Sequence, residues 1–81
     1  MDKAGIDANL TLDCSGMACP VPVIKTAQEI SRIEVGEILK VISTDAGSEV
    51  DMEAWVRQTG HELLDSQQQD GQYIFYFRRT K

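Results

Sequence analysis

The two prolines of the chain, Pro20 and Pro22, constrain its fold most, because they lie two residues apart at the start of an apolar periodic segment. Proline is favoured in the first turn of an α-helix, where its missing N–H has no intrahelical partner to lose and its φ angle is already helical. The pair therefore predicts a helix that begins at Pro20, with Cys19 as its N-cap.

Apolar periodicity supports a helix after the prolines and a strand before them. The expected helical stripe consists of Val23, Ile24, Ala27, Ile30 and Ile33. Gly36 is predicted to end this helix. Residues 10–14 alternate apolar and polar side chains with a period of two, which is typical of a strand with one buried face.

The rest of the chain repeats this strand and helix alternation. Residues 37–44 are rich in branched apolar side chains, which suits a strand in the middle of a sheet. Ser48 and Asp51 resemble a capping box that opens a second helix, and Gly60 is predicted to end it. The residues expected on its buried side are Met52, Trp55, Val56 and Thr59.

The last part of the chain predicts a hairpin. Residues 61–67 are typical of a third strand, and Asp70-Gly71 marks a tight turn into a fourth strand at 73–78. The order is β-α-β-α-β-β, which predicts an α/β (α+β) two-layer sandwich with a four-stranded mixed sheet and two helices. At 81 residues we expect a single domain over 1–81, with a flexible N-terminal tail at 1–9.

Charge and hydropathy exclude several classes of partner. Eight Lys and Arg against thirteen Asp and Glu leave a net charge of -5, which opposes attraction to nucleic acid or to anionic membranes. The N-terminus lacks the basic start and apolar run of a secretory signal, and no stretch is long enough to span a bilayer. We therefore expect a cytoplasmic protein with no direct nucleic-acid partner and no membrane partner.

The two cysteines, Cys14 and Cys19, do not suggest a disulfide framework, because small secreted domains use many bridges and reducing compartments keep thiols free. At an N-cap the unpaired amides and the helix dipole favour negative charge, so Cys19 should ionise more readily than a free cysteine. The prolines also hold its sulfur in a defined direction, which makes Cys19 the candidate nucleophile. Cys14 is expected to be buried, and a role as a second sulfur near Cys19 stays open.

Four more residues are candidates for supporting roles. Asp13 and Gly16 are expected to shape the loop before Cys19, glycine by allowing a backbone angle that other residues resist. Lys25 offers positive charge to a partner or lies on the solvated face of its helix. Asp45 is expected to form a turn, with partner binding as the alternative.

No cofactor and no metal are expected. A metal site formed by Cys14, Cys19 and His61 would have a spacing unlike the usual zinc motifs. His61 follows the second helix, where the helix dipole favours a cation, and this accounts for it without a ligand role.

The segment from Asp13 to Pro22 resembles the Asp-x-x-Gly-x-x-Cys-Pro-x-Pro signature of the TusA/SirA-like sulfur carrier proteins. The resemblance covers about Leu10 to Arg79. It continues through Lys25, Gly36-Glu37, Thr44-Asp45, Trp55, Gly60-His61 and the terminal aromatic strand. It implies a two-layer α/β sandwich in which Cys19 accepts sulfane sulfur as a persulfide, supported by Asp13, Gly16, Pro20 and Pro22.

The resemblance also implies partner proteins. Donors in the family include cysteine desulfurases and rhodanese-like proteins, and acceptors serve tRNA thiolation, molybdenum cofactor supply or sulfur metabolism. The chain would then be a sulfurtransferase component that acts as a carrier, not a stand-alone enzyme.

Two other classes of function are weighed against the carrier. The first is a redox-sensing or regulatory module with a reversible Cys14/Cys19 disulfide. The second is nucleic-acid binding, suggested by fold analogy alone and disfavoured by the acidic charge.

Overall fold

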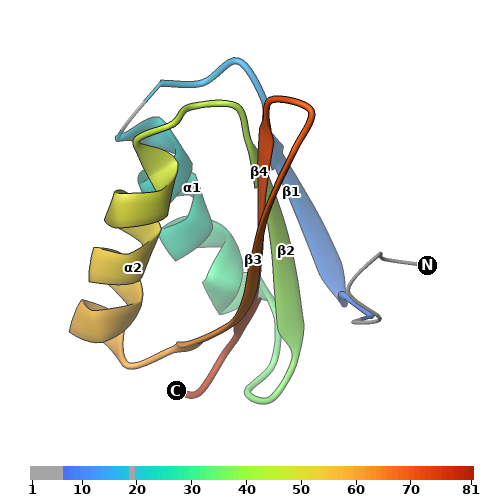
Figure 1. Cartoon of the computed structure of the whole chain (residues 1–81). Helices are drawn as coiled ribbons and strands as arrows, with labels where there is room; N and C mark the ends of the chain where they lie inside the picture. Colours follow the sequence, from blue (N-terminus) through green and yellow to red (C-terminus); the bar gives the residue numbers. More distant parts are fainter. Residues whose placement is uncertain (1–6, 19) are drawn as a thin grey trace.

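The computed structural model describes residues 7–18 and 20–81. Within these ranges the chain forms four strands, two α-helices and one turn of 3-10 helix, in the predicted order β-α-β-α-β-β. The elements are β1 (Leu10–Cys14), α1 (Val21–Glu29), η1 (Ile30–Arg32), β2 (Ile38–Ser43), α2 (Ser48–Thr59), β3 (Glu62–Gln69) and β4 (Gln72–Arg78). Both helices cover the same face of the sheet, which confirms the two-layer sandwich (Figure 1).

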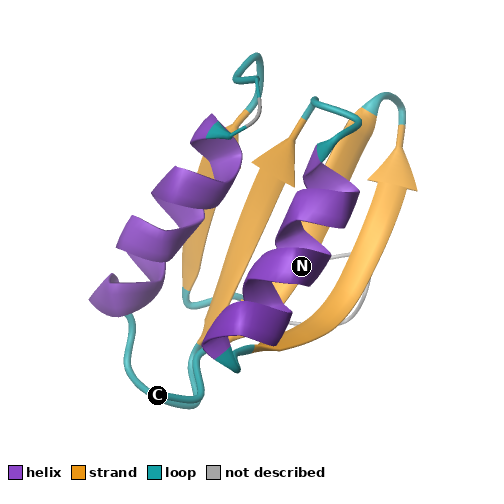
Figure 2. Ribbon diagram, turned by 90° about the vertical axis from the view of Figure 1, so that its left-hand side faces the viewer, coloured by secondary structure: helices purple, strands orange, loops and turns teal. Residues whose placement is uncertain are grey.

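The sheet has the strand order β1-β2-β4-β3. β1 and β2 are parallel, whereas β4 is antiparallel to both of its neighbours, so the sheet is mixed as predicted (Figure 2). β2 lies inside the sheet, as its apolar composition indicates. β4, the last strand of the chain, takes the other internal position between β2 and β3.

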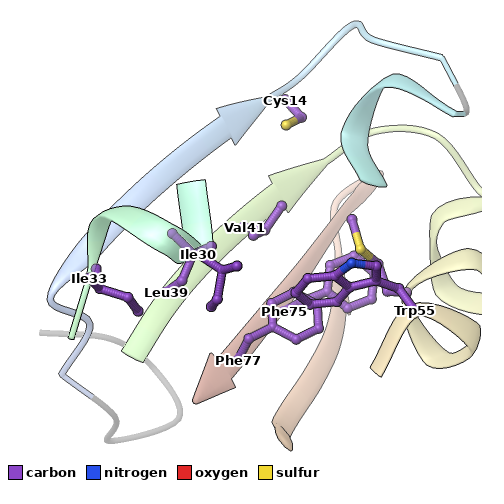
Figure 3. Close-up of a cluster of buried hydrophobic side chains, with 9 residues drawn as sticks. Cys14, Ile30, Ile33, Leu39, Val41, Trp55, Phe75 and Phe77 are labelled. Carbon is purple, nitrogen blue, oxygen red and sulfur yellow. The ribbon is translucent and has the colours of Figure 1, made fainter. Parts of the chain in front are cut away.

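The core lies between the sheet and the helices. It consists of Cys14, Ile30, Ile33, Leu39, Val41, Met52, Trp55, Phe75 and Phe77 (Figure 3). Trp55 of α2 meets the ring of Phe77 edge-on, with 5.3 Å between ring centroids. Burial of a large apolar side chain stabilises a fold by about 1.5–3 kcal/mol, so these contacts supply much of the driving force that holds α2 on the sheet.

The buried face of α1 differs from the predicted stripe. Pro22, Thr26 and Ile30 are buried, whereas Ile24 and Ala27 are exposed. The predicted stripe is confirmed at Ile30 and Ile33, which are buried, and at Val23, which packs against the core, but it is wrong at Ile24 and Ala27. It counted threonine as polar, whereas the Thr26 hydroxyl donates to the Pro22 carbonyl at 2.7 Å and is thereby satisfied inside the core.

The end of α1 also differs. The helix ends at Glu29 and passes into η1, well before Gly36. Gly36 instead occupies a turn ahead of β2 with a φ of +93°, a region that favours glycine.

α2 begins without the predicted capping box. Gly47 is its N-cap, and the Ser48 hydroxyl lies 2.6 Å from the Ser43 hydroxyl instead of capping the helix. The Ser48 hydroxyl therefore pairs with Ser43 at the end of β2 and not with Asp51, as the predicted capping box required. Gly60 does end α2, in the left-handed conformation with a φ of 83°.

The predicted hairpin between β3 and β4 is confirmed. Asp70 and Gly71 both have positive φ angles, 51° and 79°, as a type I′ turn requires. β3 begins one residue later than predicted and runs to Gln69, and β4 begins at Gln72.

The chain before β1 is attached to the sheet from Asn9 onwards. Its amide donates to the Ile38 carbonyl at 2.8 Å, and its side-chain oxygen accepts from the Ile38 amide at 2.9 Å. The predicted flexible tail therefore does not include Asn9, and its residues 1–6 lie outside the described residues. Among the described helices, neither is long and apolar enough to cross a membrane.

Candidate functional site

The candidate site is the segment between β1 and α1, which contains Cys19. Cys19 itself lies outside the described residues, but the chain on both sides of it is described. The segment leaves the carboxyl end of β1 beside the carboxyl end of the parallel strand β2, where Cys14 is in register with Ser43. Ligand sites in open α/β sheets form at the carboxyl ends of strands, so the fold places this segment where such sites occur.

Hydrogen bonds hold the segment before Cys19, which we call the cysteine loop (residues 15–18). The Ser15 amide donates to Asp13 Oδ1 at 2.9 Å, and the Met17 amide donates to the Cys14 carbonyl at 3.1 Å. Gly16 has a φ of +77°, which favours glycine, and its amide donates to the Thr44 hydroxyl at 2.8 Å. Asp13 and Gly16 therefore both contribute to the shape of the loop.

The charge of Asp13 is also favoured by this turn. Hydrogen bonds from the Ser15 side chain and then from its backbone lower the pKa of the exposed Asp13 carboxyl. An ionised carboxylate accepts hydrogen bonds and does not donate them. The turn at the end of β1 is thus present at neutral pH.

The helix after Cys19 starts one residue later than predicted. The Ile24 amide donates to the Pro20 carbonyl at 3.1 Å, which makes Pro20 the N-cap and places Pro22 within the first turn. The prediction that Cys19 is the N-cap is therefore wrong. Because the dipole effect is confined to the end of the helix, a residue before the N-cap gains less stabilisation of a thiolate than the N-cap would, and rigid presentation by the prolines becomes the main support for Cys19 as the nucleophile.

The two prolines have different environments. Pro22 is fully buried, whereas Pro20 is exposed. Val21 and Ile24, on the outer side of the same turns, are 38% and 51% exposed. One side of the helix start is thus fixed in the core, and the other presents an apolar surface to solvent next to the cysteine loop.

Cys14 is a free thiol that is fully buried at the end of β1 (Figure 3). Burial raises its pKa, an effect that the positive charge of Lys25 partly opposes and the negative charge of Asp13 reinforces. Since the thiolate is the nucleophilic form, a buried thiol with a raised pKa is a poor nucleophile.

Lys25 and Asp45 flank the candidate site. Lys25 lies half-buried on α1, near enough to Cys14 to affect its pKa. Asp45 forms the turn between β2 and α2, where its carbonyl accepts from the Ser48 amide at 3.0 Å and its carboxylate accepts from the Gly47 amide at 3.4 Å.

Analysis of single motifs missed Thr44 and the hydroxyl pair of Ser43 and Ser48. Thr44 joins the cysteine loop to the turn after β2, and the hydroxyl pair joins the end of β2 to the start of α2. The Gly16–Thr44 contact links residues 28 positions apart, and the Ser43–Ser48 contact links the end of a strand to the start of a helix, so no pattern within one element reveals them. The family resemblance includes Thr44-Asp45, and this was the sequence feature that pointed to a role for Thr44.

His61 lies far from the cysteine loop. It directly precedes β3, at the end of the strands where Arg78 is paired with both Glu62 and Ile38. Cys14 and Ser43 are paired at the opposite end of the strands. Cys14 and His61 therefore do not share a metal site. The described part of the chain holds no cluster of three or more potential metal ligands.

The predicted preference of His61 for the cationic form is wrong. Its Nδ1 atom accepts a hydrogen bond from the Thr80 amide at 3.1 Å, so this nitrogen carries no proton. Burial lowers the pKa of His61, and the positive charges of Arg79 and Lys81 lower it further.

Comparison with known proteins places the chain among sulfur-handling proteins. The model of the family described as sulfurtransferase TusA matches residues 10–79. The sulfur carrier protein TusA of Allochromatium vinosum is 35% identical over 74 residues, which cover 91% of this chain and 97% of that protein.

Two further similarities are informative about length and fold. A protein of Aquifex aeolicus, named as a candidate sulfur carrier, is 45% identical over 70 residues, or 86% of this chain. The chain spans only 36% of that longer relative. The crystal structure of a SirA-like protein from Desulfitobacterium hafniense has the same fold, with a TM-score of 0.77 at 20% identity, over 89% of this chain and 99% of that one.

Proposed function

The chain belongs to the sulfurtransferase TusA family, and we propose that it is a sulfur carrier that holds sulfane sulfur as a persulfide on Cys19. The observation that carries the proposal is that the family match runs from the start of β1 to the residue after β4 and includes the whole segment around Cys19. The fold then serves to present one thiol at the carboxyl end of β1.

The transfer needs no cofactor and balances in each step. The Cys19 thiolate attacks the outer sulfur of a donor persulfide, so a new S–S bond forms on Cys19 while the S–S bond of the donor breaks. The donor leaves as a thiolate, and the proton of its persulfide stays on the transferred sulfur. In the next step an acceptor thiolate attacks that outer sulfur, and Cys19 leaves as the thiolate.

The geometry around Cys19 supports presentation of the thiol to a protein partner. Hydrogen bonds fix the loop on one side, and buried Pro22 fixes the helix on the other. Exposed Val21 and Ile24 provide apolar surface at the start of α1, of the kind on which protein partners dock. A carrier needs no deep substrate pocket, because the protein itself transports the sulfur.

The same geometry argues against the redox module. A reversible disulfide would require Cys14, which is fully buried and has a raised pKa, to leave the core and ionise. Cys14 is therefore assigned to the core, and Cys19 alone carries the sulfur.

The proposed partners are a sulfur-donor protein, either a cysteine desulfurase or a rhodanese-like protein, and a sulfur-acceptor protein. We place the relay in the cytoplasm, where thiols stay reduced. Its destination is tRNA thiolation, cofactor supply or sulfur metabolism, and the chain acts there as a carrier component instead of a stand-alone enzyme.

The test is intact-protein mass spectrometry after incubation with a cysteine desulfurase plus cysteine, and separately with polysulfide. We expect the wild type to gain one sulfur atom that a reductant removes, Cys19→Ser to gain none, and Cys14→Ala to gain one. Loading of Cys19→Ser would refute the assignment of the persulfide to Cys19. A loss of two hydrogens on mild oxidation, with no sulfur gain from either donor, would favour the redox module instead.

A further inference from the structure

Among the described residues, a hydrogen bond from Gly16 ties the cysteine loop to the neighbouring β2–α2 turn. Three consecutive loop amides have described partners, and two of these partners, Asp13 and Cys14, belong to the end of β1 itself. The third amide, that of Gly16, donates to the Thr44 hydroxyl at 2.8 Å, across 28 positions of sequence. Of these three partners, Thr44 is therefore the one that relates the position of this loop to another part of the fold.

The β2–α2 turn that contains Thr44 is itself held by hydrogen bonds. The preceding residue, Ser43, is fully buried, and its hydroxyl lies 2.6 Å from that of buried Ser48 at the start of α2. The Asp45 amide donates to the same Ser43 hydroxyl at 3.2 Å. Thr44 thus lies between Ser43 and Asp45, which are both held by hydrogen bonds to the Ser43 hydroxyl. These bonds fix the backbone position of Thr44.

We propose that Thr44 is a positioning residue for sulfur transfer, which acts through the Gly16 amide to hold the cysteine loop in the orientation that a protein donor engages. The proposal rests on the proposed carrier function and adds to it a residue outside the cysteine segment. Without the bond, the loop samples more conformations, and the rate falls with the fraction that is competent to react.

Substitution of Thr44 should leave the fold intact. Thr44 and Gly16 are both exposed, so water replaces the lost partner of the Gly16 amide in a Thr44→Val variant. Valine keeps the branched shape and removes the hydroxyl, whereas serine keeps the hydroxyl. Thr59→Val is the matched control, because the Thr59 hydroxyl also makes one hydrogen bond, to the Trp55 carbonyl at 2.8 Å, at the far end of α2.

The experiment measures the rate of Cys19 persulfide loading by mass spectrometry, from a cysteine desulfurase plus cysteine and from polysulfide. We expect Thr44→Val to load from the desulfurase about fivefold more slowly, the factor that corresponds to one typical net hydrogen bond. Thr44→Ser and Thr59→Val should load at the wild-type rate. Polysulfide needs no docked orientation, so all four proteins should load from it equally.

The possible results separate this inference from the proposed function. If the wild type loads and Thr44→Val loads from the desulfurase at the same rate, the positioning role is refuted while the carrier function stands. Equal slowing with both donors, or equal slowing in Thr59→Val, would also refute it, because the effect would then be a general one. If the wild type loads from neither donor, the carrier function and the positioning role are both refuted. Faster hydrogen exchange of the Gly16 amide in Thr44→Val alone is the structural result that we expect alongside.

Discussion

Replacement of Cys14 tests whether this cysteine belongs to the core. Its side chain is fully buried and belongs to the same core cluster as Val41 and Leu39. A Cys14→Ala variant loses about one methylene-sized group, at a cost of about 1 kcal/mol in the free energy of unfolding. A Cys14→Ser variant places a hydroxyl in the same site, which costs about 1–3 kcal/mol more if it finds no partner. The Ser43 hydroxyl, in register with Cys14, already contacts the Ser48 hydroxyl and accepts from the Asp45 amide, which leaves it one further site, so we expect a penalty within this range.

The assay is urea unfolding of the wild type, Cys14→Ala and Cys14→Ser at neutral pH and at rising pH. Because burial raises the folded-state pKa of Cys14 above 9.0, the contribution of its neutral thiol is complete below that pH. It is lost as pH rises above 9.0, so wild-type stability should fall there more steeply than that of Cys14→Ala. A Cys14→Ser variant as stable as Cys14→Ala, or rapid reaction of Cys14 with a thiol reagent in the folded protein, would refute the reasoning.

Three further predictions concern the fold. Because burial and the nearby cations lower the pKa of His61, its neutral form contributes stability that is complete above pH 6.5 and is lost as pH falls below it. In urea unfolding curves measured over a pH series, the fall in the free energy of unfolding below pH 6.5 should be smaller in His61→Gln than in the wild type. Trp55→Ala removes the ring that packs on Phe77 and should cost about 3–5 kcal/mol in the free energy of unfolding, measured by urea unfolding followed by circular dichroism. Gly71→Ala meets no atom within 4 Å, so only its φ of +79° opposes alanine, and we expect a loss of about 1–2 kcal/mol in urea unfolding.

Sequence patterns predicted those parts of the fold that local periodicity and turn chemistry determine. Residues 10–14 form β1 with the predicted bounds, because alternation has only one consistent burial pattern there. The Asp70-Gly71 turn was predictable because few residues adopt two successive positive φ angles.

The errors arose where a hydrogen bond that the apolar pattern does not show altered a local preference. Thr26 is buried because its hydroxyl has a partner one turn earlier, so the apolar stripe of α1 was misplaced. Ser48 does not cap α2 because Ser43, at the end of another element, binds its side chain. The candidate site shows the same division, since the cysteine segment was recognised from sequence, but its tie to Thr44 depends on the packing of two loops.

The internal position of β4 determines when the sheet forms. A ribosome synthesises the chain from its N-terminus, and β4 is the last strand to emerge, yet both β2 and β3 pair with it. Until residues 72–78 are available, β2 has an open edge and the core lacks Phe75 and Phe77. The cysteine segment therefore leaves the ribosome long before the framework that holds it exists. The newly made chain therefore exposes its thiols before the four-stranded sheet is complete.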